Sequence, residues 1–243
     1  EQQDIYYHLL KDIDGFAAFF NYLNYKPKYE DVKKLILEVY DSRFCLHADL
    51  DGFIRDYPRE LAHALALIKT EPNSLFPEWL LNTFPKVEDV MMLLRGNPCE
   101  EGCSYCRTSL DAKTGLNRYF GYQYFRKFDG QNLQEMAVDA ALKNKSFITV
   151  FPTGGGKSLT YQLPALMRGE STRSLTVVIS PLQSLMKDQV DNLDERQITN
   201  SATINGLLDP IEREKVISNV RNGLISILYI APESLRSRTI ERL

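Results

Sequence analysis

The chain has 243 residues, of which 44% are hydrophobic and 25% charged, and its formal net charge is −3. This composition is typical of a soluble globular protein and excludes the disordered, fibrous and collagen-like classes. No apolar run reaches the ~20 residues that a membrane-spanning helix needs, which excludes an integral membrane protein. Four cysteines are too few for a disulfide scaffold at this length, so we expect a reducing, cytoplasmic location.

Residues 1–110 have the apolar spacing of amphipathic helices and are acidic, with 12 Lys+Arg against 18 Asp+Glu. Prolines fall between the apolar stripes, where they separate helices instead of interrupting them. We therefore expect a small all-α accessory region. The stripes consist of Ile5, Leu9, Leu10, Ile13, Phe16, Phe20 and Leu23; of Val32, Leu35, Ile36 and Val39; of Leu61, Leu65 and Ile68; and of Val90, Met91 and Leu94.

Residues 111–243 are slightly basic, with 17 Lys+Arg against 14 Asp+Glu, and alternate between strand and helix patterns. Short β-branched and aromatic runs at 147–151, 175–179 and 225–230 predict strands that are covered on both faces. Amphipathic stretches at 133–140, 182–193 and 211–220 predict helices. The alternation predicts an α/β fold with a parallel sheet.

A glycine-rich loop follows the first predicted strand and reads Phe151-Pro152-Thr153-Gly154-Gly155-Gly156-Lys157-Ser158. Consecutive glycines allow a tight turn whose backbone N–H groups cradle phosphates. In such a P-loop the lysine reaches the β- and γ-phosphates and the serine hydroxyl binds Mg²⁺, which predicts ATP and Mg²⁺ as ligands. A helix expected from about Gly156 adds its N-terminal dipole.

This loop, with its continuation Leu159-Thr160-Tyr161-Gln162-Leu163-Pro164-Ala165, resembles motif I of the RecQ family of ATP-dependent DNA helicases. Residues 120–126 resemble that family's motif 0, residues 180–189 its motif Ia, and residues 229–233 the segment that follows. The resemblance covers residues 116–243, about half of the chain. It implies a RecA-like P-loop NTPase domain, 3′→5′ helicase activity, and single-stranded DNA and duplex junctions as partners.

The resemblance also assigns roles to residues. Tyr122 would stack on the adenine, although core packing is an alternative for it and the favoured one for Phe120. Family members have two residues fewer between the arginine and the glutamine of motif 0, which weakens the assignment of Gln131. The implied nucleotide contacts are Tyr122, Arg126, Gln131, Thr153, Gly154, Gly155, Gly156, Lys157, Ser158 and Leu159; the implied DNA contacts are Ser180, Pro181, Leu182 and Gln189.

RecQ-type helicases also carry an Asp-Glu-x-His box and a second RecA-like domain. The sole Asp-Glu pair, Asp194-Glu195, lies in a helical pattern and is not that box. We therefore expect a fragment whose RecA-like domain is truncated before the box and which is inactive by itself. The resemblance implies that the whole protein acts in DNA repair and recombination. The alternative is an ATP-sensing module that binds DNA or protein without motor activity.

Three cysteines, Cys99, Cys103 and Cys106, lie in eight residues with the spacing C-x3-C-x2-C. Such a knuckle brings several thiolates to one metal ion, and Cys45, His47 and His63 are candidates for a fourth ligand. Zinc fits this spacing better than an iron–sulfur cluster. The alternative is a loop with three reduced thiols, and the RecQ resemblance gives this cluster no support.

Overall fold

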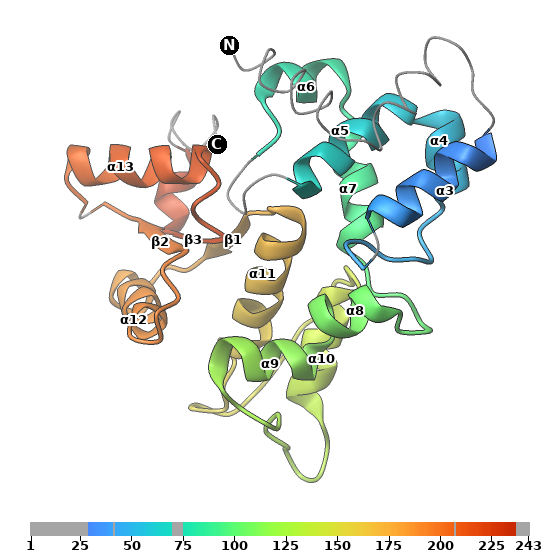
Figure 1. Ribbon diagram of the computed structural model, residues 1–243. Coiled ribbons are helices and arrows are strands. Elements are labelled where there is room, and N and C mark those ends of the chain that lie inside the picture. Colours follow the sequence, from blue (N-terminus) through green and yellow to red (C-terminus); the bar gives the residue numbers. More distant parts are fainter. Residues whose placement is uncertain (1–28, 41, 70–74, 207, 237–243) are drawn as a thin grey trace. The chain divides into compact units, whose positions relative to one another are not determined.

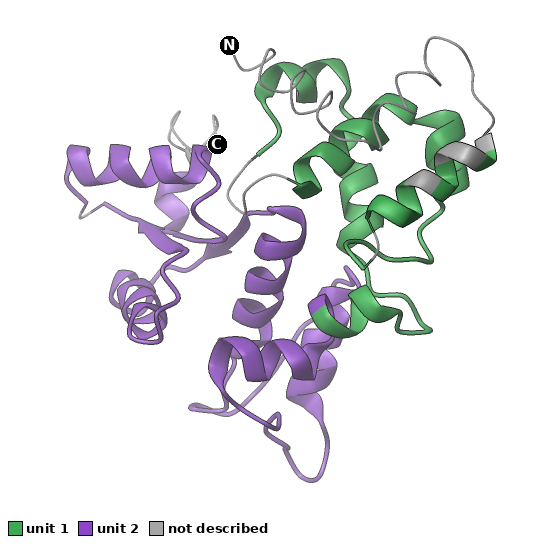
Figure 2. Ribbon diagram, viewed as in Figure 1, with its two compact units in different colours: residues 1–108 green, residues 109–243 purple. Residues whose placement is uncertain are grey.

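The computed structural model describes residues 29–40, 42–69, 75–206 and 208–236, and the chain divides into two units, residues 1–108 and 109–243 (Figures 1 and 2). The apolar stripe predicted within residues 5–23 lies outside the described residues. In the described part of the chain, every helix is too short or too polar to cross a bilayer.

The described residues of unit 1 form helices and loops without a strand, as expected. Its helices are short, and prolines stand at their starts: Pro58 is the first residue of α5, and Pro77 precedes the first residue of α6. The Asp49 carboxylate caps α4 by accepting a hydrogen bond from the backbone N–H of Gly52. The helices are α3 (Tyr29–Val39), α4 (Leu50–Asp56), α5 (Pro58–Lys69), α6 (Glu78–Thr83), α7 (Val87–Arg95) and α8 (Ser104–Ser109).

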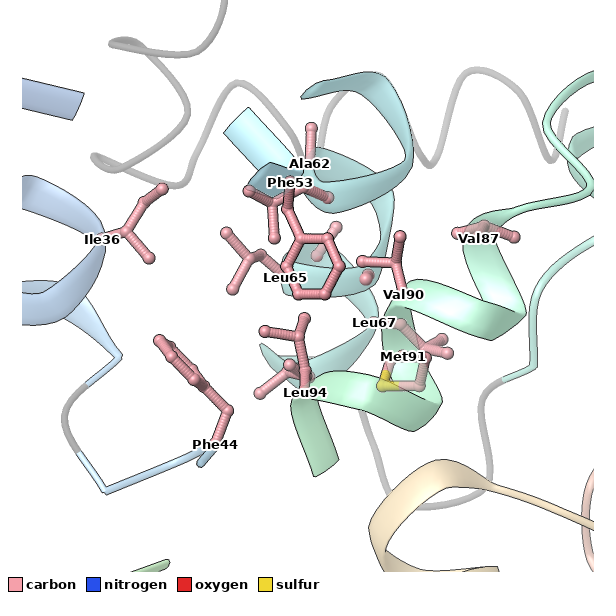
Figure 3. Close-up of a cluster of buried hydrophobic side chains, with 14 of the residues drawn as sticks. Ile36, Phe44, Phe53, Ala62, Leu65, Leu67, Val87, Val90, Met91 and Leu94 are labelled. Carbon is pink, nitrogen blue, oxygen red and sulfur yellow. The ribbon is translucent and has the colours of Figure 1, made fainter. Parts of the chain in front are cut away.

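One apolar cluster holds α3 to α7 together (Figure 3). Leu61 and Leu65 of α5 face Val90 and Leu94 of α7 across this cluster, and all four side chains are buried. Ile36 of α3 joins them. The described members of the predicted stripes thus form the core of the unit, which confirms the helical interpretation of this region.

Unit 2 contains a three-stranded parallel sheet of β1 (Thr176–Ile179), β2 (Ser201–Ile204) and β3 (Ile227–Ile230), in the order β1-β3-β2. Val178 of β1 and Thr203 of β2 both lie opposite Tyr229 of β3. The surrounding helices are α9 (Ala112–Phe120), α10 (Leu133–Leu142), α11 (Leu159–Thr172), α12 (Gln183–Asp194) and α13 (Pro210–Arg221), with a short 3-10 helix at Pro232–Arg236.

The central strand β3 is buried on both faces, so its side chains contribute to the core on both sides of the sheet. Ile227 and Tyr229 pack in one cluster with side chains of α11 and α12, whereas Leu228 and Ile230 pack in a second cluster with side chains of α13. This alternation follows from the two-residue period of a strand. Figure 1 shows α12 and α13 on opposite sides of the sheet.

The strands differ from the predictions in two places: one predicted strand is absent, and one observed strand was not predicted. The run at 147–151 is not a strand: it has no neighbouring strand among the described residues, and Ile148 is 93% exposed. Conversely, β2 was not predicted, because its sequence Ser-Ala-Thr-Ile has only one large apolar residue. The Asp194-Glu195 pair ends helix α12, which confirms that it does not follow a strand.

Gly169 allows α11 to approach the start of β3 closely. A Cβ added there would lie 2.5 Å from the Cβ of Ser226, so the backbone would have to move. We expect Gly169→Ala to lower the free energy of unfolding by about 1–2 kcal/mol despite the better helix propensity of alanine. Urea denaturation followed by circular dichroism measures this. Gly206→Ala, where an added Cβ meets nothing within 4 Å, is the control; an equal loss there would contradict the packing argument.

Candidate nucleotide site and cysteine cluster

The glycine-rich loop turns sharply because two of its residues adopt left-handed backbone conformations. Gly154 has φ 73° and Gly156 has φ 72°, a region in which residues with a Cβ are strained. Gly155 between them is required for a different reason: a Cβ there would lie 2.8 Å from the carbonyl oxygen of Pro152. All three glycines are therefore needed for this backbone path.

Lys157 and Ser158 stand between the loop and helix α11. The Lys157 ammonium donates a hydrogen bond to the carbonyl oxygen of Phe151 across the loop, at 3.0 Å. The helix begins at Leu159, three residues later than expected, and the Ser158 hydroxyl makes no capping bond to it. Lys157 and Ser158 thus lie directly before the first residue of α11, and the N-terminus of a helix is a position suited to phosphate.

A buried glutamine that the sequence did not reveal holds this loop. The Gln134 side chain is 2% exposed, and its amide Nε2 donates to the carbonyl oxygen of Gly156 at 3.0 Å. Its Oε1 accepts from the backbone N–H of Arg126 at 2.9 Å. The Arg126 guanidinium in turn donates to the carbonyl oxygen of Gly154 at 2.7 Å. Two carbonyls of the loop are thereby fixed from outside.

The extra residues after Arg126 form a small turn instead of extending motif 0. Phe128 and Gln131 pair through two backbone hydrogen bonds, and Asp129 and Gly130 between them have positive φ. The Phe128 ring stacks on Phe151, the first residue of the loop motif, with centroids 4.8 Å apart. Gln131 itself is exposed. The structure thus brings Gln134, and not Gln131, into contact with the glycine loop.

Tyr122, the predicted adenine platform, is 45% exposed, whereas Phe120 beside it belongs to the core. The two rings are stacked with centroids 6.4 Å apart. The Arg196 guanidinium lies over both rings and donates a hydrogen bond to the Tyr122 hydroxyl at 2.9 Å. Arg196 follows helix α12 directly and was not singled out in the sequence, because only the fold brings it to Tyr122.

The predicted DNA-contact residues lie at the carboxyl end of β1, where open α/β sheets place ligand-binding loops. The Ser180 N–H donates to the carbonyl oxygen of Ile230, and the Ser180 hydroxyl accepts from the N–H of Leu182. Pro181 and Leu182 are exposed. The fourth of these residues, Gln189, lies apart from them, on helix α12.

The Gln189 side chain faces inward and joins three elements. Its Oε1 accepts from the Gln162 amide of α11 at 3.0 Å, and the same amide donates to the Tyr229 hydroxyl of β3 at 3.0 Å. Burial raises the pKa of Tyr229, so its hydroxyl stays protonated at neutral pH. These bonds connect the helix after the glycine loop to the helix after the predicted DNA loop.

All four cysteines of the chain meet in unit 1. The sulfur atoms of Cys45, Cys99, Cys103 and Cys106 lie within 4.8 Å of one another, and all four thiols are free. Burial raises the pKa of Cys45 to about 11 and also raises that of Cys106, so these thiols keep their protons unless a cation replaces them.

The two histidines predicted as alternative ligands lie in different surroundings. His63 packs against the rings of Trp79 and Phe84, and burial lowers its pKa to about 4. It is not grouped with the cysteines. His47 lies 3.7 Å from a carboxylate oxygen of Glu101 and, with Cys99, forms a second, exposed group of possible ligands. Of the predicted fourth ligands, the structure therefore groups Cys45 with all three knuckle cysteines.

Comparison with known proteins concerns the second half of the chain. The family model for DEAD/DEAH box helicases matches residues 131–243. The ATP-dependent DNA helicase hus2/rqh1 of Schizosaccharomyces pombe is 46% identical over 124 residues, which are 50% of this chain and 9% of that protein. The ATP-dependent DNA helicase RecQ of Bacillus subtilis is 44% identical over 126 residues, 52% of this chain and 20% of the relative. The matched stretch thus spans a fifth or less of each.

Gln134 offers a direct test of the loop geometry. Gln134→Ala would leave the Gly156 carbonyl and the Arg126 N–H without these partners, and we expect the free energy of unfolding to fall by about 1–3 kcal/mol. Amide exchange in residues 153–157 would become faster. The exposed Gln131→Ala is the matched control and should change stability by less than about 0.5 kcal/mol. The same loss in both variants would contradict the assigned role of Gln134.

Proposed function

The second half of the chain belongs to the DEAD/DEAH box helicases as the N-terminal portion of a RecQ-type domain, and we propose that it supplies the ATP-binding part of a DNA helicase. One observation carries this proposal: a loop with two left-handed glycines presents Lys157 and Ser158 at the start of a long helix. ATP hydrolysis, 3′→5′ unwinding and action at duplex junctions in DNA repair and recombination are proposed for the whole protein.

ATP would place its phosphates against residues 154–158. The Lys157 ammonium would exchange its bond to the Phe151 carbonyl for the β- and γ-phosphates, and the Ser158 hydroxyl would bind Mg²⁺. Thr153 and Leu159 flank the same turn. Because Gln134 and Arg126 fix two carbonyls of the loop, its N–H groups need little reorganisation before they bind phosphate.

The adenine would stack on the ring of Tyr122, whose orientation is fixed by stacking with Phe120 and by the hydrogen bond from Arg196. Arg126 would lie beside the base while its guanidinium keeps the hydrogen bond to the Gly154 carbonyl. Gln131 stays a proposed contact of the base. It lies at the small turn, where its side-chain amide is exposed.

Single-stranded DNA would cross the carboxyl end of β1 at Ser180, Pro181 and Leu182. Hydroxyl and backbone N–H groups of such a loop contact phosphates without reading sequence, as a motor must. Gln189 would contact DNA and would also have a second role. Because its amide oxygen accepts a hydrogen bond from Gln162, it would link the DNA loop to α11, the helix that follows the ATP loop.

In the intact protein we expect Lys157→Ala to reduce DNA-stimulated ATP hydrolysis by roughly two orders of magnitude or more and to abolish unwinding, because the phosphate charge loses its main cation. Phosphate release and strand separation are the measurements, and an unchanged melting temperature shows that the protein is folded. Lys145→Ala, at an exposed position, is the control. Normal ATPase in Lys157→Ala would refute the assignment; an intact protein that binds ATP but never unwinds DNA would instead favour the ATP-sensing module.

The adenine platform is tested separately. We expect Tyr122→Ala to raise the Kd for ATP about tenfold, the equivalent of ~1.4 kcal/mol, because a base loses its stacking partner. Tyr122→Phe, which keeps the ring and loses only the bond to Arg196, should bind ATP nearly as the unaltered protein does. Tyr124→Ala, at a tyrosine that is 81% exposed, is the control. Unchanged ATP affinity in Tyr122→Ala, measured by calorimetry, would show that the base binds elsewhere.

A further inference from the structure

We propose that Cys45, Cys99, Cys103 and Cys106 bind one Zn²⁺ ion, which serves as a structural cross-link within the helical unit. This inference rests on the cysteine cluster alone and does not depend on the proposed helicase function. The four residues come from two segments: Cys45 from the turn after α3, and the other three from the stretch between α7 and the end of α8.

The positions of the sulfur atoms fit a single tetrahedral ion. With zinc–sulfur bonds of about 2.3 Å, the edge of a regular ZnS₄ tetrahedron is about 3.8 Å. The Cys45 and Cys103 sulfurs are 4.0 Å apart, and every pair in the cluster is within 4.8 Å. Thiolates that hold an iron–sulfur cluster must stand farther apart, because several iron and sulfide atoms lie between them. The spacing therefore favours zinc.

Backbone groups around the sulfurs are arranged to support thiolate charge. The N–H of Cys103 points at the Cys99 sulfur at 3.3 Å, and the N–H of Cys99 points at the Cys106 sulfur at 3.5 Å. Such N–H contacts orient metal ligands and stabilise their charge. Gly102, with φ 63°, makes the turn that brings Cys103 back to Cys99.

The cross-link would join parts of unit 1 that are distant in sequence. Cys45 is already held at the end of α7, because its N–H donates to the carbonyl oxygen of Leu94 at 2.9 Å. On the knuckle side, the Tyr105 hydroxyl donates to the carbonyl oxygen of Arg95. A zinc ion between these segments would close the small helical core in the way that structural zinc stabilises other small domains.

The experiment is metal analysis of the 243-residue chain, purified under reducing conditions and without an affinity metal. We expect about one zinc per chain. Cys45→Ser and Cys103→Ser should each lower the zinc content at least fivefold, measured on monomeric protein that keeps its helical circular dichroism. His47→Ala is the matched control, since it removes the alternative ligand beside Cys99 and Glu101, and it should keep its zinc.

A second measurement covers the case in which a serine variant fails to fold. Because the chain has only four cysteines and all of them lie in the cluster, a thiol reagent reports on this site alone. In the unaltered chain, zinc should slow thiol modification at least tenfold, and a chelator should abolish the protection and lower the melting temperature. Added Zn²⁺, but not Mg²⁺, should restore both.

Three results would overturn the proposal: less than about a tenth of a zinc per chain, together with thiols that react rapidly from the start; loss of zinc in His47→Ala with retention in Cys45→Ser; or iron and sulfide in place of zinc.

Discussion

The geometry of the candidate nucleotide site depends on a glycine turn that needs contacts from outside the turn to hold its conformation. Gly154 and Gly156 adopt left-handed conformations, but glycine is also the residue that loses most conformational freedom when it is ordered. Gln134, from helix α10, which precedes the loop in the chain, offsets this cost by bonding one loop carbonyl and orienting Arg126 toward a second. Because Gln134 is buried, its hydrogen bonds are shielded from competing water, and they hold the loop in this conformation without a ligand.

The residues of the candidate site can be named from the sequence more easily than the residues that support them. Lys157 and Ser158 are adjacent in a local motif, so their spacing is visible in the chain itself. Gln134 contacts Gly156, which is 22 residues away in sequence, and Arg196 contacts Tyr122, which is 74 residues away. No local sequence pattern marks either residue. Gln131 is assigned by resemblance to the glutamine of motif 0, and the two extra residues after Arg126 are what weaken that assignment.

The fold shows the same division between local and distant information. Helices are set by periodicity within one segment, and the described helical stripes are confirmed. Strands need partners: the apolar run at 147–151 has strand composition without a paired neighbour among the described residues, whereas the poorly marked β2 is a strand because β3 lies beside it. The fold class can therefore be predicted from the sequence pattern, but the segments that form the strands of the sheet cannot.

The side chain of Trp79 has a practical consequence for anyone who studies this protein in solution. It is the single tryptophan of the chain, and it lies in the helical unit with its ring edge against His63. Its emission therefore comes from a residue of unit 1, whereas the tyrosines are spread over both units. Selective excitation of tryptophan at the red edge of the absorption band thus gives a signal that originates in the helical unit, separate from the tyrosine signal of both units.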